Sequence, residues 1–213
     1  MRRHAVDPLV VHRWPGYDVA FPGHRRRLDS SYACVTSARF ARCVAEALAI
    51  PGSQLLTGTT ALEVHADRVV LRTADSVVSE LRGTAVIDAR GPDHGSPTAC
   101  GWQKFLGQEF RLTAPHGLDR PMLMDATVQQ RDGFRFVYVL PLGPDRVLVE
   151  DTYFSDGTLL DVAALRGEIA SYIAARGWRI AELEREEVGV LPLPWQHEPP
   201  AVMALLIAGY AGG

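Results

Sequence analysis

The stretch FRFVYVLPLGPDRVLVEDTYF, residues 134–154, decides the fold prediction. Two runs rich in β-branched and aromatic residues flank Gly-Pro-Asp-Arg at 143–146, whose composition suits a hairpin turn. The run PMLMDATVQQ, residues 121–130, comes just before, and Asp132-Gly133 supplies a second turn signal. The sequence therefore predicts a three-stranded antiparallel meander over residues 121–154.

Two adjacent acids, Glu150 and Asp151, end the last strand of this meander. Strand alternation places them on opposite faces, so they do not form a touching pair. If the valine face packs on the core, Glu150 points toward whatever lies opposite, and an apolar surface there would raise its pKa and keep it protonated. Asp125 ends the first strand in a similar way. Alternatively, Asp125 and Glu150 form cross-strand ion pairs with Arg135 or Arg146, and periodicity does not decide between these interpretations.

Short strands are predicted on the N-terminal side of the meander. Residues 9–36 read as antiparallel β-structure punctuated by Pro-Gly turns, and Ser37 is expected to cap a helix that stops before Pro51. Residues 55–88 return to short strands, from LLTGT to a final TAVID that is apolar enough to be buried on both faces. Residues 101–112 predict a strand broken at Gly107.

A second helix is predicted after the meander, from about Asp161 to Arg176, with Gly177 ending it. The apolar segments EEVGVLPLPW and AVMALLIAGYAGG complete the chain. The last of these is too short to span a membrane, and its glycines favour a buried strand that leads into a cofactor loop.

Composition excludes several classes of function. A net charge of −3 gives no basic surface for nucleic acid. Three cysteines without a CxxC pair predict neither a disulfide framework nor a zinc site, which favours a reducing cytoplasm. Seven histidines without i, i+4 spacing predict no metal centre. No run reaches the roughly 18 apolar residues of a membrane span, so any membrane contact is expected to be peripheral.

Several motifs, taken together and in order, resemble the bacterial lycopene β-cyclases of carotenoid biosynthesis. They are VVHRWPGYDVAFPGHRRRLDSSY, VIDARGP, GWQKFLGQEF, APHGLDRPMLMDATV, FRFVYVLPLGPDRVLVEDTYFSD and GVLPLP. The resemblance runs from about Leu9 to the last residue, and the combination of GWQKFLGQEF, MDAT and VEDTYFSD is specific.

The resemblance implies a fold of the α+β or α/β class. We expect a partial FAD-binding fold, Rossmann-like and of the glutathione-reductase type, with a large antiparallel β-sheet for the substrate. Residues 1–100 would form an incomplete FAD-binding region with inserted strands and one helix. Residues 101–195 would form the substrate sheet with a helix, and residues 196–213 would begin the closing FAD-binding segment.

The resemblance also implies an isomerase that cyclises the ψ ends of lycopene to β-ionone rings with no net redox change. Reduced FAD is required, with NAD(P)H as the electron source. Lycopene has no polar group, so cyclisation must start by protonating an alkene, and a neutral acid in an apolar site is a natural donor. Glu150 is the expected acid, with Asp125 or Asp151 tuning it or removing the final proton.

Flavin contacts implied by the resemblance fall at two places. One is the strand end at Asp88, Arg90 and Gly91, and the other is the closing motif with Gly209 and Gly212.

The chain also departs from the family pattern. None of its 19 glycines forms the GxGxxG turn that holds the FAD pyrophosphate at a helix N-terminus, and it stops inside the closing flavin motif. We therefore expect a piece of a longer cyclase, or a chain completed by a partner, with weak FAD binding and no activity alone.

Two other interpretations remain open. An FAD-dependent monooxygenase or prenyl reductase would share VIDARG, but not GWQKFLGQEF or VEDT. A degenerate remnant would bind carotenoid without turnover.

Overall fold

A computed structural model describes residues 7–90, 100–194 and 206–207. Within these ranges the chain divides into two compact units, which are described separately. The first unit holds residues 7–43 and 100–193, and the second holds the remaining described residues. The helix α1 (Ser37–Leu48) runs across the boundary between them.

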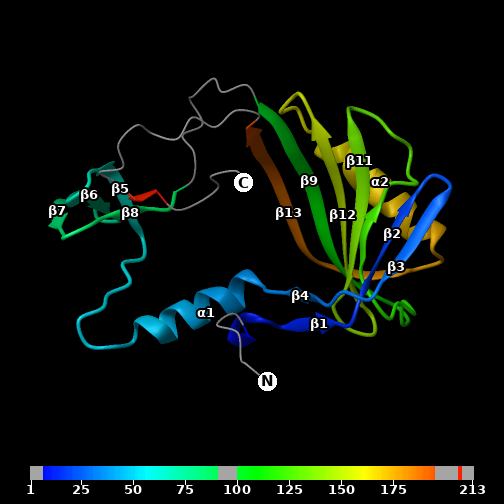
Figure 1. The fold of residues 1–213 in the computed structure, drawn as a ribbon, viewed down its shortest axis with the longest axis horizontal. Helices are drawn as coiled ribbons and strands as arrows, with labels where there is room; N and C mark the ends of the chain where they lie inside the picture. Colours follow the sequence, from blue (N-terminus) through cyan, green and yellow to red (C-terminus); the bar gives the residue numbers. More distant parts are fainter. Residues whose placement is uncertain (1–6, 91–99, 195–205, 208–213) are drawn as a thin grey trace. The chain divides into compact units, whose positions relative to one another are not determined.

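The first unit is dominated by β-structure. Its elements are η1 (Asp7–Leu9), β1 (His12–Trp14), β2 (Tyr17–Phe21), β3 (His24–Leu28), β4 (Tyr32–Cys34), β9 (Cys100–Leu112), β10 (Met122–Asp125), β11 (Phe134–Pro141), β12 (Arg146–Ser155), α2 (Val162–Ala175) and β13 (Ile180–Pro194). Seven of the strands form one sheet in the order β13-β9-β12-β11-β10-β2-β3, and β1 pairs with β4 in a separate ribbon (Figure 1).

The predicted meander is confirmed as β10, β11 and β12, which are neighbours in the sheet. The sheet is not antiparallel throughout, because β2 pairs with β10 in parallel, with Met122 opposite Asp18 and Asp125 opposite Ala20. Strands β2 and β3 were expected in the FAD-binding region, yet they form one edge of the large sheet. This pairing joins residues about a hundred positions apart, so local patterns did not predict it.

The predicted break at Gly107 is wrong, because β9 is continuous over 13 residues. Gly107 sits in register opposite Glu150 of β12, in the middle of an unbroken ladder. Its φ lies outside the left-handed region, so the backbone has no need of glycine there. The absence of a side chain, rather than a bend, is what this glycine contributes.

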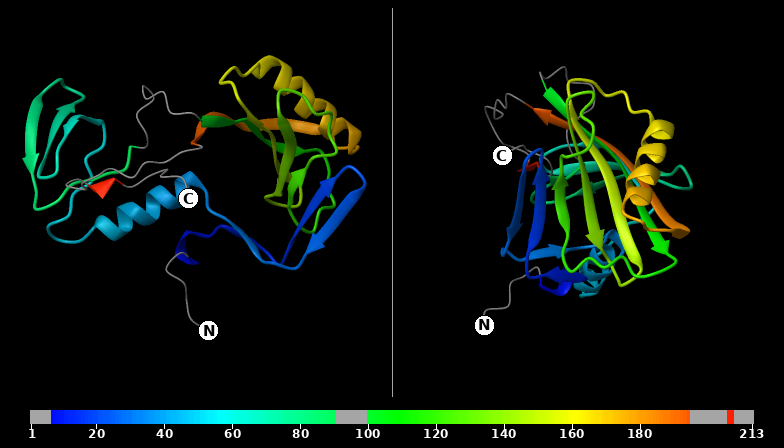
Figure 2. Two further views of the ribbon diagram at one scale, coloured as in Figure 1. Left: turned by 45° about the horizontal axis from the view of Figure 1, so that its top comes forward. Right: turned by 90° about the vertical axis from the view of Figure 1, so that its right-hand side faces the viewer.

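Helix α2 covers one face of the sheet (Figure 2). The Asp161 side chain caps it by accepting a hydrogen bond from the Ala164 N–H at 3.0 Å, and Gly177 ends it with a φ of 71°. Both boundaries agree with the sequence prediction. The core lies between α2 and the sheet and contains Leu106, Phe110, Leu112, Val137, Val139, Val147, Val149, Tyr153, Leu165, Ile169, Tyr172 and Ile173. We call this side of the sheet the α2 face.

A buried ion pair lies within this core layer. Arg135 of β11 donates two hydrogen bonds to Asp151 of β12, from Nε at 2.8 Å and from a terminal nitrogen at 2.7 Å. Asp151 is 0% exposed and Arg135 is 2% exposed. Burial alone would lower the pKa of Arg135, but the hydrogen bonds and charge of Asp151 outweigh burial and raise it. Burial raises the pKa of Asp151, and the hydrogen bonds and charge of Arg135 oppose this rise. Two charge-assisted hydrogen bonds thus join the side chains, and Glu168 of α2 adds a third contact at 3.1 Å.

Helix α1 begins at the predicted residue, but the capping side chain is one position earlier. The Arg39 N–H donates to Thr36 Oγ1 at 3.2 Å, so Thr36 is the N-cap instead of Ser37. No residue of α1 is buried among the described residues, and Phe40 is 52% exposed.

The second unit contains a three-stranded antiparallel sheet of β5 (Thr59–Val64), β6 (Arg68–Thr73) and β7 (Val78–Arg82). It also contains a parallel pair, β8 (Ile87–Asp88) with β14 (Leu206–Ile207). Residues 55–58 form no strand. The prediction that TAVID is buried on both faces is wrong for the described residues, because Ile87 is 62% exposed and β14 is the one strand paired with β8 there.

We predict that Asp151→Ala lowers the free energy of unfolding by about 3 kcal/mol, because it removes the buried carboxyl group and leaves the half-buried Glu168 as the one described acid paired with the Arg135 guanidinium. Arg13→Ala is the control, because Arg13 and Asp7 form an exposed pair that should contribute less than about 1 kcal/mol. Urea unfolding measures the free energy of unfolding of both variants. Equal decreases would show that the buried ion pair contributes no more to stability than the exposed pair.

Candidate active site on the face opposite α2

The side of the sheet opposite α2 carries Glu150, and we call it the Glu150 face. Residues paired across neighbouring strands share a face, so the register defines its members. They are Leu148, Glu150, Thr152 and Phe154 of β12; Leu140, Tyr138, Phe136 and Phe134 of β11; and Glu109, Gly107, Phe105 and Gln103 of β9. Most of these side chains are apolar or aromatic, as a hydrocarbon ligand would require.

Glu150 is half-buried on this face and accepts a hydrogen bond from Thr152 Oγ1 at 2.8 Å on its Oε1. Burial raises the pKa of Glu150, the negative charge of Glu187 raises it further, and the Thr152 hydrogen bond opposes the shift. Within the described ranges, no basic side chain forms an ion pair with Glu150. The direction of this pKa shift agrees with the prediction, and it favours the neutral form of the carboxyl group.

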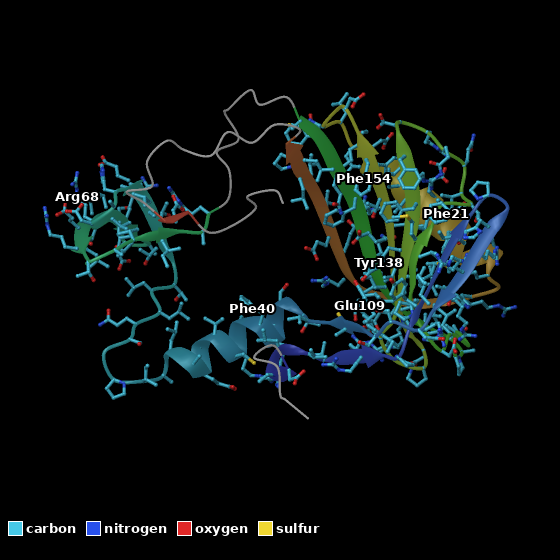
Figure 3. All side chains as sticks on the ribbon, viewed as in Figure 1. Phe21, Phe40, Arg68, Glu109, Tyr138 and Phe154 are labelled. Carbon is cyan, nitrogen blue, oxygen red and sulfur yellow. The ribbon has the colours of Figure 1, made fainter. Side chains whose placement is uncertain are left out.

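Aromatic side chains share this face with the acid. The rings of Phe134, Phe136 and Phe154 pack against one another with centroids 5.5 to 6.2 Å apart. Tyr138, opposite Glu150 on β11, shares a 2.7 Å hydrogen bond between its hydroxyl and that of Tyr32 in β4. Burial is the main cause that raises the pKa of Tyr138, so the phenol is neutral. Figure 3 shows Tyr138 and Phe154 along the same sheet.

The other two predicted acids lie on the α2 face. Asp151 is held by Arg135, as described above. Asp125 accepts hydrogen bonds from Tyr172 at 2.9 Å and from Arg176 at 2.9 Å, both in or at the end of α2. Burial would raise the pKa of Asp125, but these bonds together with that of Thr127 lower it. The structure therefore separates Glu150 from both aspartates by the thickness of the sheet.

The alternative prediction, in which Asp125 and Glu150 form ion pairs with Arg135 or Arg146, is wrong. Arg135 pairs with Asp151, and Arg146 pairs with Glu109 at 2.8 Å and with Glu184. Asp125 does form an ion pair, but with Arg176. Among the described residues Glu150 has no basic partner, and it lies on the face that carries the aromatic side chains.

The predicted flavin contacts fall in the second unit. Arg90 donates to both carboxylate oxygens of Asp88, at 2.9 and 2.6 Å, and these side-chain hydrogen bonds lower the pKa of Asp88 to about 2. The pair stands at the end of β8, which lies parallel to β14. Gly91, Gly209 and Gly212 lie outside the described residues.

This strand end fits one edge of a flavin site, since open α/β sheets bind ligands at the ends of parallel strands. A FAD pyrophosphate also needs backbone N–H groups at a helix N-terminus. The described part of the second unit provides no glycine-rich turn of that kind.

No group of three or more histidine, cysteine or acidic side chains among the described residues could hold a metal ion. Nor does any helix in the described ranges have both the length and the apolar character needed to cross a membrane.

Sequence reasoning missed Gly107 and Tyr138 as neighbours of the acid. Strand alternation places Thr152, two residues after Glu150, on the same face, but it does not reveal the hydrogen bond between the two side chains. A glycine inside a strand can mark close approach of another group, which was the available signal for Gly107. Tyr138 required the register between β11 and β12, which depends on tertiary structure.

Comparison with known proteins identifies the family. The family model described as lycopene cyclase protein matches residues 2–213. The chain belongs to the lycopene cyclase family. Lycopene cyclase relatives include a lycopene beta-cyclase of Pantoea ananas, 44% identical over 94% of this chain and 53% of its own length. Those of Pseudescherichia vulneris and a Paracoccus species are 46% and 38% identical, over 90% and 96% of this chain and 48% and 50% of theirs.

The chain thus spans about half the length of these lycopene cyclase relatives. Among solved structures, a geranylgeranyl bacteriochlorophyll reductase-like protein from Thermoplasma acidophilum matches with a TM-score of 0.67 at 13% identity, covering 93% of this chain and 54% of that one. A flavin-dependent brominase matches with a TM-score of 0.58 at 11% identity, covering 87% and 52%. These likenesses show a fold shared with flavin-dependent enzymes, in agreement with the predicted partial flavoprotein fold.

We predict that Glu150→Gln stabilises the protein as the pH rises. The folded-state pKa of Glu150 is raised, so its stabilising contribution is complete below the unfolded value of about 4.3 and is lost as the pH rises through the folded value. Glutamine does not ionise and escapes this loss. Urea unfolding at pH 5 and pH 8 should show the variant gaining on the wild type, and a gap that narrows with pH would contradict the raised pKa.

Proposed function

We propose that the protein is the acid-bearing half of a lycopene β-cyclase and that Glu150 is the general acid. The observation that carries this proposal is a half-buried carboxyl group with a raised pKa, on an aromatic face and without a paired cation. Its relatives are lycopene beta-cyclases. A neutral acid on an apolar surface can reach an alkene that has no polar group to bind.

The proposed reaction is an isomerisation in which atoms and electrons balance. The Glu150 O–H bond breaks and a C–H bond forms at one carbon of the terminal double bond of lycopene, leaving a carbocation. A second double bond attacks this cation and closes the six-membered ring. The carboxylate left on Glu150 then takes up one proton from the new ring, which restores a double bond and the neutral acid, so no net oxidation occurs. The neutral rings of Phe136, Tyr138 and Phe154 exclude water from the cation and present their π faces to it.

Asp151 and Asp125 take a different role from the one expected. Each is bound to an arginine on the α2 face, where it cannot reach a substrate on the Glu150 face. We propose that Asp151 acts by holding β12 in register with β11, and that Asp125 anchors β10 to α2. Both are positioning residues in this proposal.

We also propose that the whole enzyme uses reduced FAD, with NAD(P)H as the electron source. When bound, the reduced flavin would supply electron density to a cationic centre. Asp88 and Arg90 are proposed contacts of this cofactor at the β8 strand end, with Gly91, Gly209 and Gly212. Because the relatives are about twice as long as this chain, we propose that activity needs the remaining length.

Colour complementation tests the proposal. In lycopene-accumulating cells, the chain extended to the length of its relatives should turn red colonies orange-yellow by forming β-carotene. Glu150→Gln should reduce product by at least about a hundredfold, because the proton donor is lost. Full turnover by the variant would refute Glu150 as the acid.

The same assay separates the alternatives. Oxygenated or reduced products would indicate an FAD-dependent monooxygenase or a prenyl reductase, and bound carotenoid without flavin or product would indicate a remnant.

We further propose that the β2–β3 hairpin contacts the membrane in which lycopene dissolves. Edge strand β3 exposes Arg25 and Arg26, which form no ion pair with the described acids, whereas Arg27 is bound to Asp119. Phe21 precedes the hairpin turn on β2 (Figure 3). Exposed arginines beside an aromatic residue suit an anionic lipid surface, although charges on an edge strand also prevent aggregation.

Reversing both charges, by Arg25→Glu with Arg26→Glu, should weaken binding to vesicles containing phosphatidylserine by about tenfold or more, at roughly 1 kcal/mol per basic residue. Sedimentation with these vesicles gives the measurement, and neutral phosphatidylcholine vesicles are the control. Unchanged binding to the anionic vesicles would show that the two arginines serve only to prevent aggregation through the edge strand.

A further inference from the structure

We infer that Glu150 delivers its proton from Oε2, above the backbone of Gly107, while Thr152 holds Oε1. Thr152 is then a positioning residue for the acid, and Gly107 is the residue that gives the substrate access to it. This inference rests on the proposed role of Glu150 as the general acid, and it adds which oxygen reacts and from which side the alkene approaches.

The two oxygens of Glu150 have different partners. Thr152 Oγ1 donates a 2.8 Å hydrogen bond to Oε1, and Thr152 is fully buried two residues along the same strand face. In a neutral carboxyl group one oxygen carries the proton and the other accepts hydrogen bonds. A hydroxyl that donates to Oε1 makes this oxygen the acceptor. The proton is therefore on Oε2.

Oε2 lies against the position where Gly107 has no side chain. A Cβ atom at residue 107 would stand 3.3 Å from Glu150 Oε2 and 3.6 Å from Glu150 Cγ. Because the backbone of Gly107 has an ordinary φ, glycine is needed here for space alone. Any larger residue would fill the volume next to the acidic proton and push the carboxyl group aside by a few tenths of an ångström.

Leu148 Cδ1 lies 3.7 Å from where a Cβ atom of residue 107 would stand, and the charge of Glu187 on β13 also acts on Glu150, whereas the aromatic rings of the neighbouring strands are held elsewhere. On β13, a Cβ on Gly189 would overlap the ring of Phe105, so this ring lies across the Gly189 backbone. On the opposite flank of Glu150, the Tyr138 side chain is tied to Tyr32 by its hydroxyl. The β9 side of Glu150, over Gly107, is therefore the side on which the end of a polyene meets Oε2.

Proton transfer strengthens the Thr152 contact. When the Oε2–H bond breaks and the new C–H bond forms, Glu150 becomes a carboxylate. A hydrogen bond to a charged oxygen is stronger than one to a neutral oxygen, so Thr152 stabilises the product of this step. The hydroxyl thus orients the acid beforehand and favours loss of its proton.

The pH profile of Thr152→Val in the full-length enzyme tests which oxygen carries the proton. Activity requires neutral Glu150, so the rate falls as the pH rises through its pKa. Removing a donor that favours the carboxylate should raise this pKa and move the alkaline limb of the kcat profile upward by about one pH unit. The plateau kcat should fall about tenfold because the carboxyl group loses its orientation. Thr152→Ser keeps the hydroxyl and should restore both values.

A limb that moves to lower pH would show that Thr152 accepts the proton from Oε1, and the inference would be overturned. An unmoved limb with unchanged kcat would also overturn it, because Thr152 would then have no effect on the acid.

Gly107→Ala tests the access side. The added methyl group should lower kcat/KM by about tenfold or more through displacement of Glu150. Gly167→Ala is the matched control, because a Cβ there would meet nothing within 4 Å on the exposed side of α2, and its activity should equal that of the wild type. Circular dichroism confirms that each variant is folded.

The access geometry at Gly107 and the proposed function of Glu150 can be refuted separately. Wild-type rates for folded Gly107→Ala and wild-type profiles for Thr152→Val, together with an inactive Glu150→Gln, would overturn the access geometry and leave the proposed function in place. Full activity of Glu150→Gln would refute the proposed function itself.

Discussion

The buried ion pair between Arg135 and Asp151 is the constraint on which the site depends. It joins β11 to β12 under α2, where neither side chain reaches water. A shift of one residue in β12 would move Asp151 out of this contact and bring Glu150 into the helix-covered core. The pair therefore selects a single register, and that register places Glu150 between Tyr138 and Gly107 on the opposite face.

Two adjacent carboxyl groups thus acquire different partners. Asp151 is bound by a guanidinium, whose hydrogen bonds and charge oppose the rise in pKa that complete burial causes. Among the described residues Glu150 has no basic partner and accepts a hydrogen bond from one hydroxyl group, so less opposes the rise in pKa that burial causes there. Environment rather than residue type separates a structural charge from a group able to donate a proton. Such a neutral acid is also a cost to stability at higher pH, as expected where function and stability compete.

The relatives show that the chain belongs to the lycopene cyclase family, and the solved structures show a fold shared with flavin-dependent enzymes. The parallel pairing of β8 with β14 is consistent with that fold, because it brings Leu206 and Ile207 beside the Asp88 strand. The large sheet holds the proposed acid, and the second unit holds the strand end proposed to contact the cofactor.

Local sequence determined the features that depend on short-range chemistry. Turn residues between strands predicted β10, β11 and β12, while Asp161 and Gly177 marked the ends of α2. Period-two alternation placed Glu150 and Asp151 on opposite faces, and this is a property of any extended strand. Tertiary structure decided three other features. It set the parallel pairing of β2 with β10 and the arginine that binds Asp151, and it showed that Gly107 leaves space for Glu150 without breaking strand β9. These features join residues far apart in the chain, so they depend on register and packing that no local pattern contains.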